Sequence, residues 1–236
     1  MSNHLYAGGN NAYGQLGLGH TQTGHSRMHL ITQNLPIGEL TAVAAGNYHS
    51  LVVIGGKLFT CGRNDQGQLG LGNQPLQVLF QPVTQNLSDK RVVMIAGGCN
   101  YSLAVTEDNQ LYACGNNLEG QLGLGKGVVA NSFQRVTHNL LGQKIIAIAA
   151  GNAHIVVLTE TSLLTTSRSG GGQLMPMALD MLLPGEKILT IAAGNHFTMV
   201  STNRGRVLAY GSNNRGQLGL TNPKYTLKLT PVIELL

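Results

Sequence analysis

Short runs that alternate apolar residues with small or polar ones recur along the chain, and each run ends at a glycine-rich turn. One such run reads KLFTCG over 57–62, QLYACG over 110–115 and RVLAYG over 206–211, with the copy LYAGG over 5–9. A period of two is typical of half-buried strands. No segment keeps apolar residues at a sustained helical spacing. The pattern therefore predicts a protein that is nearly all β.

A second kind of run is built from small residues. It reads VAAGNYHSLVV from 43, IAGGCNYSLAV from 95, IAAGNAHIVVL from 148 and IAAGNHFTMVS from 191. Ala-Ala-Gly leaves almost no side chain, which suits a place where strands of several units converge and their backbones approach closely. We expect a bend at Gly-Asn to divide each run into two strands. An outer strand is expected at the segments LITQNL, PVTQNL, RVTHNL, PMALDML and PVIELL, which begin at 30, 82, 135, 176 and 231.

The glycine-rich turn is the most regular feature of the chain. It reads GNNAYGQLGLG from 9, GRNDQGQLGLG from 62, GNNLEGQLGLG from 115 and GSNNRGQLGL from 211, with an eroded copy, SRSGGGQL, from 167. The Gly of each Gly-Gln-Leu lies at 14, 67, 120, 172 and 216, so the intervals are 53, 53, 52 and 44 residues. A fixed period of this size indicates repeated supersecondary units.

Each copy of this turn is best explained by backbone geometry. Glycine takes a positive φ without steric cost, and Asn is the next most tolerant residue. The leucines that follow are expected to enter a core. The glycine spacing also resembles a phosphate-binding loop, but the Lys-Ser/Thr ending and a helix directly after the loop are missing. The residues predicted to shape the turn are Gly14, Asn64, Gly67, Asn117, Gly120 and Gly216.

Four antiparallel strands per unit, repeated at this period and converging on a small-residue strand, describe the blades of a β-propeller. The paired signatures A-A-G-N-x-H-S-L and G-x-N-x-x-G-Q-L-G-L-G resemble the repeats of the regulator of chromosome condensation family, and the resemblance covers essentially the whole chain. We therefore expect an all-β, propeller-like array of four-stranded antiparallel blades in a single repeat domain over 1–236. Its units are expected near 1–41, 42–90, 91–144, 145–187 and 188–236.

The first unit lacks its small-residue strand pair, so about 18 strands, or four and a half blades, are expected. A closed small propeller, an open arc and a piece of a longer protein all remain open. The segment 231–236 is the candidate that could close the half-blade at the N-terminus. The unit over about 142–182 is short and has lost part of its turn, which we interpret as tolerated decay of a loop.

Composition and charge narrow the class of partner. Hydrophobic residues make up 42% of the chain and charged residues 11%, which is too apolar for a disordered protein. The net charge is +5 without a run of basic residues, which disfavours nucleic acid as a partner. The opening MSNHLYAGG has no secretory signal, and no apolar stretch is long enough to insert into a membrane.

The cysteines indicate a reducing compartment. Cys61 and Cys114 lie 53 residues apart at one repeat position, and Cys99 lies in another repeated strand. They are interpreted as small buried apolar residues and not as a disulfide framework. The cytoplasm or the nucleus is therefore the expected location. The richness in Gln, Asn and Leu would also suit a bacterial effector that is delivered into a host cell.

No combination of residues suggests an active site, so no catalytic residue, cofactor or metal is expected. His49 and His154 share one repeat position with Tyr101 and Phe197, and this exchange indicates packing with a hydrogen bond. A looser cluster has no Cys or carboxylate to complete a metal site, and a solvated loop is the favoured interpretation. Its members are His20, His25 and His29.

Basic residues recur seven or eight positions ahead of the fixed Gly of the small-residue strand. They are Lys90 with Arg91, Lys144 and Lys187. We expect them at nearly the same corner of three successive blades, where they would form a basic rim suited to an acidic partner surface. Ordinary turn lysines that aid solubility are the equal alternative.

The family resemblance implies a function in protein recognition. The partner it implies is a Ran-type small GTPase or another component of its cycle, and the favoured function is an interaction propeller. The alternative is a guanine nucleotide exchange factor for Ran, which needs no acid, base or nucleophile because it displaces nucleotide and metal from the GTPase. In the founding family member a protruding β-wedge does this work, and no unit here has an obvious extra hairpin. Chromatin binding is the weakest hypothesis, since no basic tail precedes Leu5.

Overall fold

A computed structural model describes residues 4–127, 129–140, 142–166, 171–221 and 224–232. Within these ranges the regular secondary structure consists of eighteen strands and no helix. The strands form five antiparallel sheets. The described residues thus contain no helix that could cross a membrane. The expected all-β, propeller-like architecture is confirmed.

Four sheets have four strands each, and the N-terminal sheet has two. The two-stranded sheet, called the half-blade below, pairs β1 (Leu5–Gly9) with β2 (His25–Ile31). The first full blade contains β3 (Leu40–Ala45), β4 (His49–Ile54), β5 (Lys57–Gly62) and β6 (Gln77–Pro82). The second contains β7 (Val92–Gly97), β8 (Tyr101–Thr106), β9 (Leu111–Gly115) and β10 (Ala130–Val136). The third contains β11 (Ile145–Ala150), β12 (Ile155–Thr159), β13 (Leu163–Thr166) and β14 (Leu174–Pro176). The fourth contains β15 (Ile188–Ala193), β16 (Phe197–Thr202), β17 (Val207–Ser212) and β18 (Tyr225–Val232).

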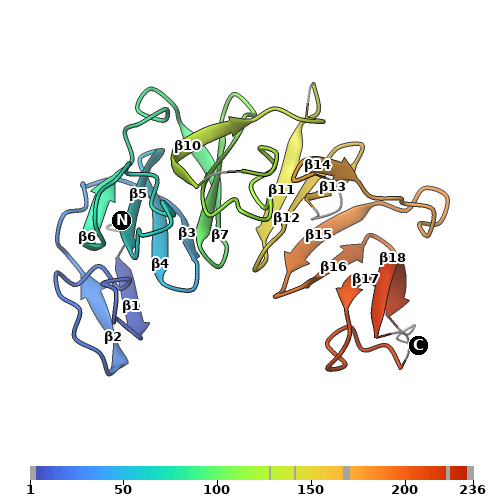
Figure 1. The fold of residues 1–236 in the computed structure, drawn as a ribbon, viewed down its shortest axis with the longest axis horizontal. Helices are drawn as coiled ribbons and strands as arrows, with labels where there is room; N and C mark the ends of the chain where they lie inside the picture. Colours follow the sequence, from blue (N-terminus) through green and yellow to red (C-terminus); the bar gives the residue numbers. More distant parts are fainter. Residues whose placement is uncertain (1–3, 128, 141, 167–170, 222–223, 233–236) are drawn as a thin grey trace.

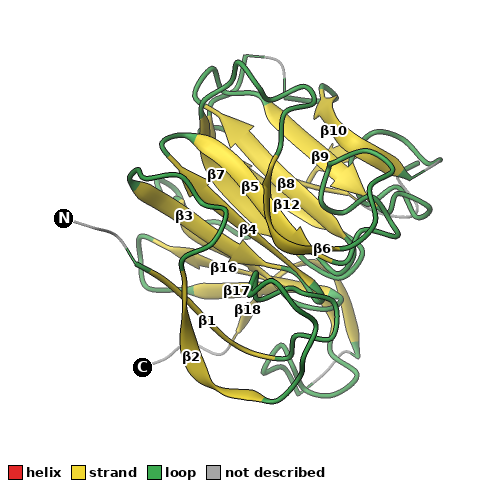
Figure 2. Ribbon diagram, turned by 90° about the vertical axis from the view of Figure 1, so that its left-hand side faces the viewer, coloured by secondary structure: helices red, strands yellow, loops and turns green. Residues whose placement is uncertain are grey.

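The blades follow one another around an open arc. Figure 1 shows them as an arch with a wide gap between the half-blade and the fourth blade, and Figure 2 shows the same sheets from the side. The sequence did not decide between a closed small propeller and an open arc, and the described residues form the open arc. The segment proposed to close the half-blade lies elsewhere, because Val232 and Pro231 pair with Val207 and Leu208 in the fourth blade. Residues 233–236 lie outside the described residues.

The first strands of the four full blades, β3, β7, β11 and β15, contact one another in series. Their small residues make this possible. A Cβ added to Gly97 would lie 2.6 Å from the carbonyl carbon of Ala45, and one added to Gly46 would lie 2.4 Å from the oxygen of Gly98. Side chains at these positions would force the blades apart, so the expected close approach of backbones is confirmed.

The apolar cores lie between blades and not within single ones. Leu51 and Val53 of the first blade pack in one cluster with Tyr112 and Phe133 of the second. The third and fourth blades share a second such cluster, which contains Val156 and Val200. Burial of a leucine-sized side chain stabilises the fold by about 1.5–3 kcal/mol. Each blade is therefore held mainly by its neighbours.

Four of the five predicted outer strands are wrong by about one strand length, since the observed ones end where the predicted ones begin. Of the fifth, 231–236, only 231 and 232 are among the described residues, and both lie in β18. For example, β6 ends at Pro82 and β10 at Val136. The Gln-Asn-Leu and His-Asn-Leu stretches instead form turns, in which Asn86 and Asn139 have φ of 63° and 59°. Such a φ ends a strand. The side-chain amide of Asn86 then donates to the oxygen of Phe133 in the next blade at 2.8 Å, so the segment fastens one blade to another.

Candidate functional site

The glycine turns lie between the third and fourth strands, and their glycines have left-handed backbones. Gly14, Gly67, Gly120 and Gly216 have φ of 75°, 71°, 79° and 73°. Three of these turns pack against the next blade, so that a Cβ on Gly67 would lie 2.7 Å from the Cα of Asn131. Carbonyl groups in the turns add hydrogen bonds across the same boundary: the Gln68 oxygen accepts from the hydroxyl of Ser102 at 2.6 Å. The turns thus join neighbouring blades.

The asparagines that recur in the glycine turns have a role that the sequence did not predict. None of Asn11, Asn64, Asn117 and Asn213 has a positive φ. Their side chains bridge the turn instead. The Oδ1 atom of Asn64 accepts from the amide of Leu69 at 3.0 Å, and its Nδ2 donates to the oxygen of Gln74 at 2.7 Å. Because Asn64 and its counterparts are buried, these bonds replace water for backbone groups that would otherwise be unsatisfied.

A second set of bonds between blades runs through the aromatic or histidine residue that begins the second strand. The Nε2 atom of His49 lies 2.9 Å from the hydroxyl of Ser102 in the next blade. The hydroxyl of Tyr101 donates to the oxygens of Gly151 and His154 at 3.0 and 2.6 Å. Burial lowers the pKa of His49 and of His154 to about 4, so both rings are neutral at pH 7. They are packing residues, as the sequence predicts, and each ring is hydrogen-bonded to the hydroxyl of a residue in the next blade.

The four residues predicted to form a basic rim each lie just before the first strand of their blade. Three of them have a carboxylate neighbour on the hairpin between the second and third strands of the same blade: Lys90 pairs with Asp108 at 3.2 Å, Arg91 with Glu107 at 3.7 Å and Lys144 with Glu160 at 3.8 Å. Lys187 has no ion pair among the described residues, and its amide donates to the side chain of Asn203. The rim is therefore a band of mixed charge.

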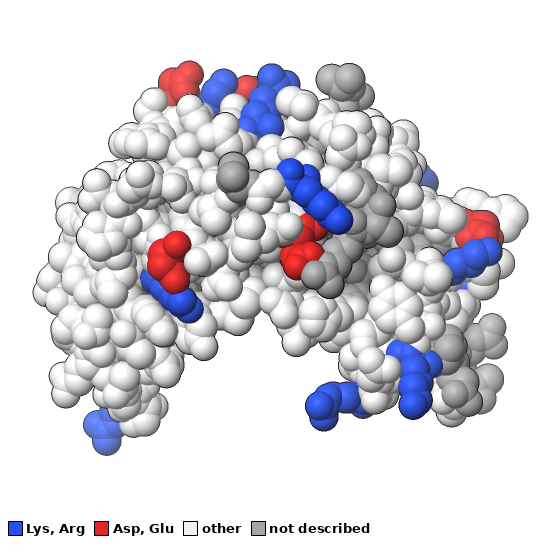
Figure 3. Space-filling view, in the orientation of Figure 1, with Lys and Arg blue, Asp and Glu red and all other residues white. Residues whose placement is uncertain are grey.

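The pKa values at the rim reflect this pairing. The hydrogen bond to Asp108 raises the pKa of Lys90, and hydrogen bonds from Thr106 and Lys90 lower the pKa of Asp108. Mixed charge shortens the reach of the electrostatic field and favours contacts made at close range. The face turned toward the viewer in Figure 3 is the opposite one, and it also carries Lys and Arg next to Asp or Glu at several places.

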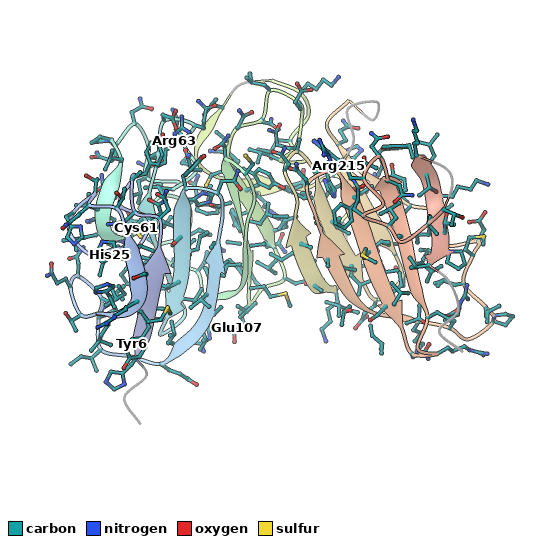
Figure 4. The ribbon with its side chains drawn as sticks, turned by 90° about the horizontal axis from the view of Figure 1, so that it is seen from below. Tyr6, His25, Cys61, Arg63, Glu107 and Arg215 are labelled. Atoms are coloured by element: carbon teal, nitrogen blue, oxygen red, sulfur yellow. The ribbon has the colours of Figure 1, made fainter. Side chains whose placement is uncertain are left out.

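A site on the opposite face was not predicted from the sequence. The guanidinium carbon of Arg63 lies 5.1 Å from the ring centre of Tyr13 and 5.7 Å from that of Tyr48, and Arg63 also pairs with Asp65 at 2.6 Å. Figure 4 shows Arg63 and Arg215 on one side of the arc and Glu107 on the other. Arg63, Tyr13 and Tyr48 each occupy a position that varies between the repeats, so the sequence pattern does not indicate that they contact one another.

The remaining candidate residues do not form a metal or redox site in the described part of the chain. His25 lies 3.1 Å from His29 and stacks on His20 with ring centres 5.3 Å apart, but no group of three or more His, Cys, Asp or Glu has a geometry that could hold a metal. The cysteines are free. Cys99 lies in the bend after β7 and not in a strand, and its sulfur accepts a hydrogen bond from Asn47 at 3.0 Å.

Comparisons with known proteins agree with the repeat pattern. A family model described as the regulator of chromosome condensation (RCC1) repeat matches residues 2–53, 55–105 and 108–158, and a second model of the same repeat matches 40–68, 92–121 and 188–217. The secretion-regulating guanine nucleotide exchange factor of Bos taurus is 32% identical over 91% of this chain and 49% of its own length. The X-linked retinitis pigmentosa GTPase regulator of Canis lupus familiaris is 28% identical over 98% of this chain and 29% of its own length. The chain thus spans half or less of the length of these relatives.

Solved structures support the fold in the same way. Human WBSCR16 has a TM-score of 0.84 and 24% identity, with coverage of 97% of this chain and 62% of that one. Prp20p of Saccharomyces cerevisiae has a TM-score of 0.79 and 19% identity, with coverage of 98% and 59%. At this level of identity the likeness establishes a common blade arrangement.

Proposed function

The chain belongs to the regulator of chromosome condensation (RCC1) repeat family, and on that premise we propose that it is an interaction module that binds a small GTPase or another component of the GTPase cycle. One observation carries the proposal. Relatives named as a guanine nucleotide exchange factor and as a GTPase regulator align with 91% and 98% of this chain. Ran is the specific GTPase that we propose.

The geometry suits recognition of a folded protein. Repeat arrays present broad rigid surfaces, and the cores between blades hold the two faces of this arc in fixed relation. On one face the rim contains the cationic residues Lys90, Arg91, Lys144 and Lys187. An acidic partner surface can form ion pairs with them in addition to the carboxylates that already lie beside three of them. We propose this rim as the surface for the GTPase.

Guanine nucleotide exchange on Ran is the second candidate, and the bovine relative, which is named as a guanine nucleotide exchange factor, favours it. Exchange requires that part of the factor displaces the nucleotide and its metal ion. Among the described residues every strand belongs to the half-blade or to a blade, and no additional hairpin projects from the arc. We therefore place binding ahead of exchange.

The test uses Ran loaded with a fluorescent guanine nucleotide. Stable complex formation, measured by interferometry with immobilised chain, without faster nucleotide release supports the interaction module. Accelerated release establishes the exchange factor instead. If Ran does not bind but another small GTPase in a parallel panel does, the proposed binding of a small GTPase stands and Ran is rejected as the partner. Absence of binding to every GTPase in either nucleotide state would overturn the proposal.

A further inference from the structure

The third blade has a much shorter connection between its third and fourth strands than the other full blades. This connection comprises 63–76 in the first blade, 116–129 in the second, 167–173 in the third and 213–224 in the fourth. In the first, second and fourth blades it contains the glycine turn. Residues 167–170 lie outside the described residues, but 171–173 are described and fix the place of the third connection.

Gly172 occupies the place of a fourth strand and not that of a glycine turn. Its oxygen accepts from the amide of Gly125 in the second blade at 2.9 Å. The equivalent amide of the first blade, that of Gly72, donates at 2.8 Å to the oxygen of Asn131, which lies in β10. The Gly-Gln-Leu at 172–174 thus leads directly into the fourth strand of its blade. A glycine turn of the usual length is missing from the third blade.

The missing turn changes the boundary between the third and fourth blades. At an ordinary boundary a main-chain oxygen of the turn accepts from the next blade, as the Gln68 oxygen accepts from the hydroxyl of Ser102 at 2.6 Å. By position in the repeat, Thr198 is the counterpart of Ser102 in the fourth blade. Its hydroxyl is bonded to the Nε2 atom of His154 at 3.1 Å instead. Side chains therefore line this boundary where a turn backbone lies at the others.

A pocket of about 360 Å³ lies at this boundary. Figure 1 shows the two blades that form it side by side in the right limb of the arch. The pocket lies at the ends of the blades where the first strand bends into the second, whereas the rim lies at the opposite ends. No Lys or Arg is found among the described residues that line it. Its walls carry five aromatic or imidazole rings and one carboxylate, which belong to His154, His196, Phe197, Tyr210, Tyr225 and Glu119.

Walls of this kind attract a cation. The rings of Tyr210 and Tyr225 have centres 6.5 Å apart and planes inclined at 66°, so they form two walls at an angle. The face of an aromatic ring is electron-rich and binds a cation that lies within about 6 Å of its centre. His154 does not oppose this charge at pH 7, because burial lowers its pKa to about 4. The partly buried carboxylate of Glu119 adds a negative charge to the same pocket.

The hydroxyl groups in the pocket are already engaged in hydrogen bonds. The hydroxyl of Thr166 accepts from the amide of Ile155 at 3.0 Å and donates to the oxygen of Gln121 at 3.4 Å. That of Thr165 donates to the oxygen of Ile155 at 3.0 Å. A guanidinium group presents five N–H donors, and each costs free energy if it is buried without an acceptor. A trimethylammonium group presents none, so these walls suit a methylated ammonium better than a guanidinium.

We propose that the pocket between the third and fourth blades binds a methylated ammonium group, which lies against the rings of Phe197, Tyr210 and Tyr225. The missing turn of the third blade, interpreted from the sequence as tolerated decay, is what leaves the pocket open. Because the pocket and the rim lie at opposite ends of the blades, this ligand is separate from the GTPase surface proposed above. The methylated ammonium group can belong to a lysine side chain of a protein or to a free small molecule, and the chemistry of recognition is the same.

The experiment titrates the 236-residue chain with choline and follows the ring resonances of tyrosine and histidine by NMR. We expect saturable shifts of the ring signals of Tyr210 and Tyr225. The control ligand is the neutral carbon isostere of choline, in which a tert-butyl group replaces the trimethylammonium group. It has the same shape without the charge, so it should bind at least about tenfold more weakly.

Substitutions in the chain locate the site. Tyr225→Leu keeps an apolar side chain but removes one ring, and it should weaken choline binding at least about fivefold. Tyr225→Phe keeps the ring and should bind choline within about twofold of the natural chain. The matched control is Tyr6→Leu in the half-blade, at the other end of the arch in Figure 1, which should leave binding unchanged. Tyr225 and Tyr6 are 49% and 51% exposed, so all three variants should fold.

A second set of ligands distinguishes the sources of the cation. The N-acetylated amides of trimethyllysine and arginine are titrated in the same way. Tighter binding of the trimethyllysine amide than of choline supports a protein side chain as the ligand, and the reverse order supports a free small molecule. Tighter binding of the arginine amide than of the trimethyllysine amide would overturn the proposal in favour of a guanidinium. It is also overturned if choline does not bind saturably, if the neutral isostere binds equally well, or if Tyr225→Leu has no effect.

Discussion

The imidazole of His49 is hydrogen-bonded to the hydroxyl of Ser102, which lies 53 residues later and in the next blade, with Nε2 2.9 Å from Oγ. One repeat period separates the two residues, so the bond joins consecutive copies of one sequence motif. His154 repeats the relationship with Thr198 at 3.1 Å. Both histidines have a pKa lowered to about 4 by burial, which makes the stability of the arc sensitive to acid.

The first prediction concerns pH. In the unfolded chain these histidines titrate near pH 6.5, and in the folded chain near pH 4, so between these values the unfolded state binds more protons. The free energy of unfolding should therefore be fully maintained above about pH 6.5 and fall as the pH drops to about 4, by on the order of 3 kcal/mol per histidine. Urea unfolding at several pH values measures this slope.

A matched variant separates the histidines from other acid-sensitive groups. Phenylalanine occupies the same repeat position at 197, so the double variant His49→Phe, His154→Phe should fold. Its free energy of unfolding should depend much less on pH between 6.5 and 4 than that of the natural chain. An unchanged slope would show that other groups dominate the acid response.

A second prediction compares two glycines with the same backbone angle. Gly67 has φ of 71° and faces the Cα of Asn131, whereas Gly216 has φ of 73° and no described atom within 4 Å of an added Cβ. Gly216→Ala should cost only the left-handed backbone penalty of about 1–2 kcal/mol. Gly67→Ala should cost at least about 3 kcal/mol, since it also overpacks a boundary between blades. Equal losses in denaturant unfolding would contradict the role assigned to the turn.

The third prediction concerns the buried turn asparagine. Asn64→Ala removes a donor and an acceptor and leaves the Leu69 amide and the Gln74 carbonyl without their partners. We expect a loss of about 2–4 kcal/mol in the free energy of unfolding. Asp65→Ala, an exposed change in the same turn, should stay within about 0.5 kcal/mol and is the control. Thermal and urea unfolding of both variants provide the comparison.

The fourth prediction tests the rim as the partner surface. Reversal of Lys90, Arg91, Lys144 and Lys187 to Glu should weaken capture of the GTPase at least about tenfold, mainly through slower association. The ion pairs lost in the process are solvent-exposed, so each should contribute little to stability and the fold should persist. Arg215→Glu, on the other face in Figure 4, is the charge-reversal control. Unchanged capture by the rim variant would remove the rim from the proposal.

The sequence predicts most of the fold because the repeat contains its own evidence. The small-residue strand, the strand before the turn and the missing pair at the N-terminus can each be identified by comparing copies, and the observed strands β1, β3 and β5 lie at or near the expected positions. The outer strand was misplaced because Thr-Gln-Asn-Leu alternates like a strand. Asn86 instead turns the backbone and uses its side chain on the next blade. Such a contact across about 50 residues has no local signature.

The candidate sites were harder to predict for a related reason. The positions of the basic rim follow from the repeat, but its pairing with Glu107, Asp108 and Glu160 does not, since these acids lie on a hairpin that varies between units. The cluster of Arg63 with Tyr13 and Tyr48 combines residues from variable positions of two units. Repetition makes shared positions visible, whereas binding surfaces are built from the positions in which the copies differ.

The placement of the apolar cores between blades has a consequence for how such a chain can evolve. Each boundary between two blades is built from equivalent repeat positions. Gene duplication or loss of one whole unit therefore recreates an equivalent boundary between the blades that become neighbours. A deletion of half a unit would instead leave a leucine-rich face uncovered. Selection should therefore tolerate changes of copy number in whole periods and preserve the junctions, and the length of the array can drift while its local architecture stays the same.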